Sequence, residues 1–133
     1  MNPNLPIVEC IPNFSEGRDP AIIDALAATV QRSTDVKLLH RTSDTDHNRS
    51  VLTFAGAPDA VLQTAFELIQ LAADKIDMTQ HSGQHPRLGA TDVVPFVPIQ
   101  GVTLADCVQM AHTLGQRVGT ELGLPIYLYE AAA

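Results

Sequence analysis

The chain has 133 residues, 45% of them hydrophobic, which suits a single domain with one core over residues 1–133. Its formal net charge is −7, with eight basic and fifteen acidic residues; this argues against a nucleic-acid partner, which needs a basic face, but not against a small anionic ligand. No apolar run approaches the ~20 residues that cross a bilayer, and MNPNLPIVEC lacks the features of an export signal, so we expect a cytoplasmic protein without membrane association.

Apolar periodicity predicts strands and helices in the order β-α-β-β-α-β-α-β. The strands are expected at residues 5–11, 36–40, 49–55, 92–99 and 125–129. The helices are expected at about residues 20–33, 58–76 and 104–122. The first six elements match the split βαβ, ferredoxin-like arrangement. The predicted fold class is therefore α+β, with one mixed or antiparallel sheet and helices on one of its faces.

Local signals mark the helix ends. Asp19 is a capping residue and Pro20 suits the first helical position. Thr103 is expected to cap the third helix, which Gly123 and Pro125 then end.

The strand expected at residues 92–99 contains prolines, which cannot donate to a sheet ladder, so we expect it to be near an edge or bulged. Cys10 and Cys107 fall within apolar elements, and we expect both to be buried free thiols, as suits a cytosolic protein.

Three connecting segments are more polar than their connecting role requires. PNFSEGR (12–18) precedes a helix N-terminus and could aim backbone N–H groups at a ligand, although an ordinary turn fits it equally. The second segment, DTDHNRS (44–50), lies at a hairpin, in which the polar loop TSDTDHN (42–48) is expected to join the second and third strands. Its Asp and Asn residues suit a turn that bonds its own backbone, and His47 fits an exposed loop residue better than a ligand.

The third segment, HSGQHPRLG (81–89), holds two histidines four residues apart. A helical turn would make them a metal clamp, but Gly83 and Pro86 both oppose a helix, and no third ligand stands at a telling spacing. The other interpretation is a rigid loop that holds His85 up to a cleft, with Arg87 nearby. An imidazole with a pKa near ~6.5 is a natural acid or base at neutral pH.

Three sequence motifs resemble those of a known family in their residues, order and spacing: VECIPNFSEGR, DHNRSVLTFAG and IDMTQHSGQHPRLGATDVVPFVPI. Together they resemble the N-terminal subdomain of the glutamate formimidoyltransferase (formiminotransferase) family over about residues 6–130. The resemblance implies formimidoyl transfer between N-formimidoyl-L-glutamate and tetrahydrofolate in histidine degradation, with tetrahydrofolate as a substrate and no metal. It also implies that His85, in the HPR motif, is the catalytic acid/base. The positions that match other motif residues are candidates for ligand contact or loop support: Asn13, Ser15, Gly17, Asn48, Arg87 and Asp92.

The chain departs from the family pattern in three ways. The family's second, folate-binding subdomain is expected to be absent, which would leave half of the groove between the subdomains. LLHRT (38–42) stands where some members read LLDxD, and Gln84 stands where Glu is usual before the motif histidine. We therefore expect weak or no activity from the chain alone, because poor orientation of two substrates raises the barrier.

A second interpretation is a non-catalytic module that binds a folate-like or small acidic ligand or assembles with a partner. The intact His85 favours the enzyme, and the missing half favours the module. Either way, the expected partners are small folate and glutamate derivatives, together with a second chain that supplies the other subdomain or another copy of this chain. An excised piece of a longer protein is a third interpretation.

Overall fold

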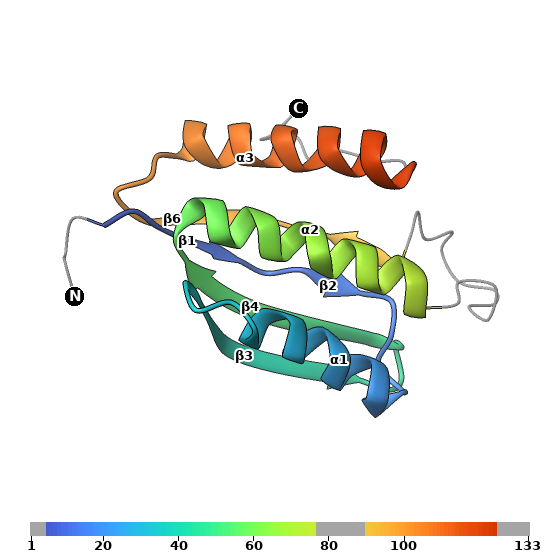
Figure 1. The fold of residues 1–133 in the computed structure, drawn as a ribbon. Helices are drawn as coiled ribbons and strands as arrows, with labels where there is room; N and C mark the ends of the chain where they lie inside the picture. The colour runs from blue at the N-terminus through green and yellow to red at the C-terminus, as the bar shows by residue number, and fades with distance from the viewer. Residues whose placement is uncertain (1–4, 77–89, 125–133) are drawn as a thin grey trace.

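The computed structural model describes residues 5–76 and 90–124, and Figure 1 shows how their elements are arranged. The strands are β1 (Ile7–Cys10), β2 (Asn13–Phe14), β3 (Val36–Asp44), β4 (Arg49–Gly56), β5 (Thr91–Val93) and β6 (Phe96–Gln100). The helices are α1 (Pro20–Gln31), α2 (Pro58–Lys75) and α3 (Leu104–Arg117), which continues into the π-helical segment η2 (Val118–Leu122). No helix in the described ranges has the length and apolar character that a membrane crossing requires.

The strands form one sheet in the order β5-β2-β4-β1-β6, with β3 also paired to β4. All these pairs are antiparallel. β1 and β2 both pair with β4, so they act as two parts of one interrupted strand. β5 and β6 continue the sheet beside them in the same way.

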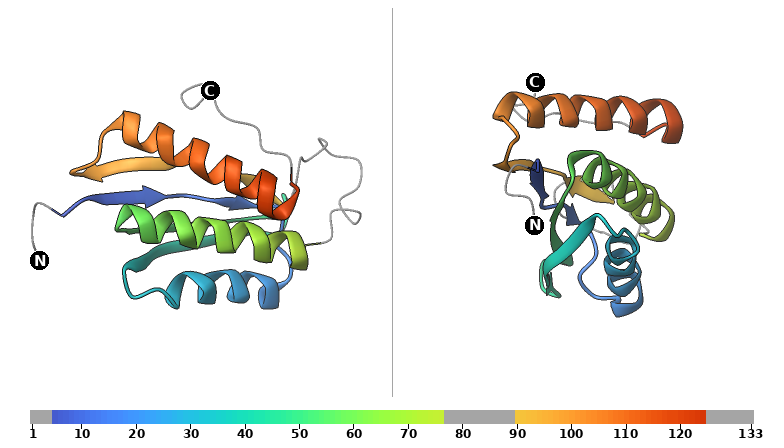
Figure 2. Two further views of the ribbon diagram at one scale, coloured as in Figure 1. Left: turned by 45° about the horizontal axis from the view of Figure 1, so that its top comes forward. Right: turned by 60° about the vertical axis from the view of Figure 1, so that its left-hand side comes forward.

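The three helices lie on one face of the sheet, as Figure 2 shows from two directions. The predicted α+β class, with one sheet and helices on one face, is confirmed, and the order of elements is consistent with a split βαβ fold. The strand predicted at residues 125–129 lies outside the described residues.

Alternation along β4 separates the two faces of the sheet. Ser50, Leu52 and Phe54 are buried under the helices, whereas Arg49 and Val51 alternate with them and so lie on the uncovered face. The largest buried side chains of the core include Phe14, Leu26, Leu52, Phe54 and Leu68. The helices thus cover one face with a continuous apolar layer and leave the other face open.

The structure corrects three strand boundaries. The segment predicted as a loop at 12–18 contains β2, because the chain resumes pairing directly after Pro12, whose carbonyl accepts from the Leu52 amide at 3.2 Å. The strand predicted at 92–99 is two strands separated at Pro95, and β6 tolerates Pro98 because β1 is its only described neighbour. β3 runs to Asp44, which shortens the hairpin loop to residues 45–48.

The helix signals predicted at Asp19, Pro20, Thr103 and Gly123 are confirmed, and Pro125 lies outside the described residues. The Asp19 carboxylate accepts from the Ala21 amide at 2.9 Å. Thr103 and Asp106 form a capping box, with hydrogen bonds of 2.9 and 3.0 Å. Gly123 ends η2, the continuation of α3, in a left-handed conformation with a φ of 67°.

Both thiols are free and buried, as predicted. Burial raises the pKa of Cys10 well above its ordinary value and also raises the pKa of Cys107. Neither side chain is therefore a reactive thiolate near neutral pH.

Candidate functional site

The structure brings two of the three polar segments into direct contact. The backbone amide of Gly17 donates to the Asn48 side-chain carbonyl at 2.9 Å, across 31 residues of sequence. Arg18 Nε donates to the Thr45 carbonyl at 2.8 Å. Asn48 has a φ of 50°, a left-handed conformation that asparagine tolerates better than most residues and that turns the hairpin back into β4. We call the contact between residues 12–18 and residues 44–50 the loop junction.

Gly17 lets the two backbones of the loop junction approach closely. A Cβ built on Gly17 would lie 2.3 Å from the Asp44 carbonyl oxygen and 2.4 Å from the Arg49 nitrogen. These are main-chain atoms of β3 and β4, which cannot swing aside as a flexible side chain can. The junction therefore requires glycine for lack of space.

Asn13 and Arg49 form the polar centre of the junction. Asn13 pairs with Val51 across β2 and β4, which places it on the uncovered face together with Arg49. Arg49 Nε donates to the Asn13 side-chain carbonyl at 2.9 Å, and Arg49 Nη2 donates to the same oxygen. The Asn13 amide nitrogen donates to the Ile11 carbonyl at 3.1 Å, which fixes the orientation of the amide.

The residues that directly follow the HSGQHPRLG segment (81–89) contact the same junction. The Ser15 amide donates to the Ala90 carbonyl at 2.8 Å, and Ser15 is fully buried. β5 then pairs with β2, and Asp92 in its middle is exposed. Five of the predicted site residues therefore lie in or beside this junction: Asn13, Ser15, Gly17, Asn48 and Asp92.

His85 and Arg87 lie outside the described residues, so their predicted roles stay predictions. Among residues 5–76 and 90–124, no three His, Cys, Asp or Glu side chains are grouped so that they could hold a metal ion.

Asp44 and His47 form an exposed pair at the hairpin. His47 Nδ1 lies 2.6 Å from Asp44 Oδ2, while Asp44 Oδ1 accepts from the backbone amides of Asp46 and His47 at 2.9 and 3.3 Å. The turn chemistry predicted for these residues and the exposure predicted for His47 are both confirmed. The hydrogen bond from His47 is the main reason that the pKa of Asp44 is lowered.

Replacing His47 with alanine should raise the pKa of Asp44 toward the ordinary aspartate value of about 3.9. Because the folded-state pKa is lowered, the stability that this carboxylate contributes is present above the unfolded pKa and is lost as the pH falls through the folded one. As the pH falls from the unfolded to the folded pKa of Asp44, the wild type should therefore lose more stability than His47→Ala, and the two stability curves should converge below that interval.

An NMR titration of the aspartate side-chain carboxyl carbons measures this shift. Asp106 is an internal reference, because its pKa is lowered by Thr103 in a separate capping box. An unchanged Asp44 titration in His47→Ala would show that the backbone amides alone set its pKa.

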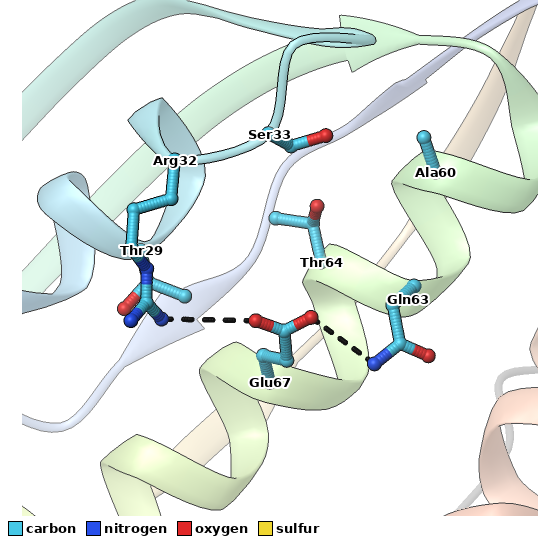
Figure 3. Close-up of a pocket in the computed structure, with 7 residues that line it drawn as sticks. All are labelled: Thr29, Arg32, Ser33, Ala60, Gln63, Thr64 and Glu67. Carbon is cyan, nitrogen blue, oxygen red and sulfur yellow. Dashed lines mark hydrogen bonds and ion pairs between the residues drawn. The ribbon is translucent and has the colours of Figure 1, made fainter.

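A shallow pocket lies elsewhere, between α1 and α2 (Figure 3). It is lined by Thr29, Arg32, Ser33, Ala60, Gln63, Thr64 and Glu67. Figure 3 shows the Arg32 guanidinium directed toward Glu67, at 3.7 Å, and Gln63 bonded to the same carboxylate at 3.0 Å. None of these residues belongs to the loop junction.

The list of site residues predicted from the sequence did not include Asp44, His47 or Arg49, although an arginine beside the motif loops suits forked carboxylate recognition. For Arg49 a signal was present, since it stands in the same DHNRS stretch as the predicted Asn48. Nothing in the spacing indicated that its partner would be Asn13, because 36 residues separate the two.

The fold makes this chain a one-sheet α+β domain. Its site is a hydrogen-bonded polar surface, where the loops of the junction meet the uncovered face of the sheet. The family model for the formiminotransferase domain, N-terminal subdomain, matches residues 7–133. The chain therefore belongs to the formiminotransferase family and corresponds to its N-terminal subdomain.

Named relatives agree with this assignment. The chain is 51% identical over 127 residues to glutamate formimidoyltransferase of Streptococcus pyogenes serotype M1, an alignment that covers 96% of this chain and 42% of that protein. It is 48% identical to glutamate formimidoyltransferase of Thermoplasma acidophilum, with the same coverage. It is 46% identical to formimidoyltransferase-cyclodeaminase of Sus scrofa, covering 96% of this chain and 24% of that protein. The chain thus spans less than half the length of these relatives.

Proposed function

We propose that this chain supplies the catalytic acid/base, and one side of the active-site groove, for formimidoyl transfer between N-formimidoyl-L-glutamate and tetrahydrofolate. The observation that carries the proposal is the match of residues 7–133 to the N-terminal subdomain, together with the 51% identity to a glutamate formimidoyltransferase. Tetrahydrofolate is a substrate in this proposal, and the reaction needs no metal. The setting that follows is one-carbon metabolism linked to histidine degradation, in the cytoplasm.

The proposed chemistry has two proton transfers. An amine of tetrahydrofolate attacks the formimidoyl carbon and loses a proton, and the glutamate nitrogen gains a proton as it leaves the tetrahedral intermediate. One imidazole serves both steps if its pKa lies near neutral pH. His85 is the residue that we propose for this role, because it occupies the HPR motif. Arg87 and Asp92 are proposed ligand contacts.

The loop junction supports this proposal by providing a rigid binding surface. Asn13, Gly17 and Asn48 are held by hydrogen bonds of 2.9–3.1 Å or by backbone contact, so a ligand need not order them first. We propose that Asn48 meets the ligand at this surface and that the buried Asn13, Ser15 and Gly17 support it.

A second subdomain completes the groove in this proposal, because the chain spans only 42% of the bacterial relative. That subdomain would come from the same longer protein, from a separate chain or, in the homodimer alternative, from a second copy that supplies an equivalent face.

The experiment that tests the proposal is titration calorimetry of the chain with folinic acid, a stable reduced folate, and with N-formimidoyl-L-glutamate. Micromolar binding of folinic acid, followed by transfer when both true substrates are supplied, would support it. Absence of binding by either ligand up to millimolar concentration would exclude a folate site formed by this chain alone. Binding without transfer, unchanged by His85→Ala, would favour the non-catalytic module.

A further inference from the structure

We propose that Arg49 is the carboxylate-binding residue of the loop junction and that it holds an anionic end of the substrate on the uncovered face of the sheet. The identity of the carboxylate rests on the proposed function. The chemistry of the site rests on Arg49, Asn13 and their surroundings.

Arg49 is placed where a ligand can reach it. It is the first residue of β4, it is exposed, and it alternates with Ser50, which is buried under the helices. Because the helices lie on the opposite face (Figure 2), the described structure leaves the Arg49 side open. β4 pairs with β1, β2 and β3, so the backbone that carries Arg49 is supported on both sides.

Asn13 orients the guanidinium without neutralising it. The Asn13 carbonyl accepts from Arg49 Nε and Nη2, and the Ile11 carbonyl keeps the Asn13 amide from flipping. No described residue accepts from Arg49 Nη1, so the Nη1–Nη2 edge is the edge left for a planar, forked acceptor. A carboxylate matches this edge with two parallel hydrogen bonds.

The charge of Arg49 has no carboxylate partner among the described residues. Three of the described arginines pair with carboxylates: Arg32 with Glu67, Arg41 with Asp24 and Arg117 with Glu121. The other two, Arg18 and Arg49, lie at the loop junction and their side chains donate only to neutral carbonyl oxygens. In a chain with a net charge of −7, the junction thus keeps two positive charges without a carboxylate partner among the described residues.

The carboxylate that faces Arg49 across the β3–β4 ladder is engaged elsewhere. Asp44 stands opposite Arg49 in the β3–β4 register. Both of its oxygens are used within the hairpin, by the Asp46 and His47 amides and by the His47 ring. Asp44 therefore shapes the turn and leaves the free edge of Arg49 for an external anion.

Two parts of the proposed substrates carry suitable carboxylates: the glutamate of N-formimidoyl-L-glutamate and the glutamyl tail of the folate. We distinguish them by titrating wild type and Arg49→Gln with N-formimidoyl-L-glutamate, with folinic acid and with the folinic acid analogue that lacks the glutamyl group. Glutarate serves as a probe that contains carboxylates and neither reacting group. Backbone amide shifts of Asn13 and Arg49 report binding.

Arg49→Gln should weaken glutarate binding about 10- to 100-fold, because a charge-assisted bidentate contact is lost. Asn13→Asp should weaken it similarly while keeping the arginine, since the new carboxylate would neutralise Arg49 internally. Arg32→Gln removes an exposed arginine from the far side of the domain and should change nothing. Urea unfolding of each variant verifies that the fold is retained.

The outcomes separate this proposal from the proposed function. Equal glutarate binding by wild type and Arg49→Gln, or no glutarate binding by wild type, would overturn the carboxylate site even if folinic acid binds. Arg49-dependent binding of glutarate, with no binding of folinic acid or N-formimidoyl-L-glutamate, would uphold the site and contradict the proposed function. If only N-formimidoyl-L-glutamate weakens in Arg49→Gln, its glutamate is the source. If folinic acid weakens and its tail-less analogue does not, the source is the glutamyl tail.

Discussion

Gly17→Ala is expected to destabilise the domain by about 3 kcal/mol, at the upper end of the cost of overpacking, because the added methyl has nowhere to go. It would lie 2.3 Å from the Asp44 carbonyl oxygen, 2.4 Å from the Arg49 nitrogen and 2.6 Å from the Arg49 carbonyl oxygen. All three contacts are with backbone, so relief requires β3 and β4 to move away from the loop junction. Urea-induced unfolding measures the loss.

Gly119→Ala is the matched control. A Cβ at Gly119 would meet nothing within 4 Å, and the residue lies in the helical segment η2. This substitution should be neutral or stabilising by up to about 1 kcal/mol, because alanine loses less conformational freedom than glycine on folding. A difference between the two variants of less than about 1 kcal/mol would contradict the steric account of Gly17.

His85→Ala is expected to lower the rate of formimidoyl transfer by about 100- to 10,000-fold, the usual contribution of a positioned general acid/base. Because the chain spans only 42% of its bacterial relative, the sharpest assay uses a chimera. In it, residues 7–133 of this chain replace the matching part of the Streptococcus pyogenes glutamate formimidoyltransferase. The measured quantity is the transfer rate at saturating concentrations of both substrates.

His112→Ala is the control for this prediction, because His112 is an exposed histidine of α3 outside the loop junction. It should leave the rate unchanged. Added imidazole should partly restore transfer in His85→Ala if the missing group moves protons. Equal rates in wild type and His85→Ala would remove His85 from the mechanism, whatever ligands the chain binds.

The helix ends were predictable from the sequence because their determinants are local. Asp19 caps a backbone amide two residues away, and Thr103 exchanges hydrogen bonds with Asp106 three residues away. Such contacts depend on residue type and spacing, which the sequence displays directly.

Strand boundaries were less predictable because pairing partners are distant. Residues 13 and 14 read as a loop, and only their contacts with β4 and β5 make them a strand. Likewise, the prolines of residues 92–99 indicated an edge or a bulge, but they did not show that β5 ends at Val93 and that a separate strand begins at Phe96 against β1. The alternation that suggests a strand is carried by at most a few residues in these short pieces.

The candidate site was partly predictable. Motif positions pointed to Asn13, Gly17 and Asn48, which the fold gathers into one junction. Their interactions were not visible: the Gly17 amide meets the Asn48 side chain across 31 residues, and Arg49 reaches Asn13 across 36. Such contacts are set by strand register, which the sequence does not state.

The central position of β4 has a consequence for how a bound anion would change the stability of the domain. β4 is hydrogen-bonded along both of its sides, so exposing its amides requires the sheet itself to open. Arg49 begins this strand, and we therefore expect an anion held there to oppose the opening of the sheet. Ligand binding would then raise the thermal stability of the whole domain as well as order a local loop. Arg49 would hold the carboxylate of the substrate at a fixed position, and the reacting groups would be oriented relative to that position.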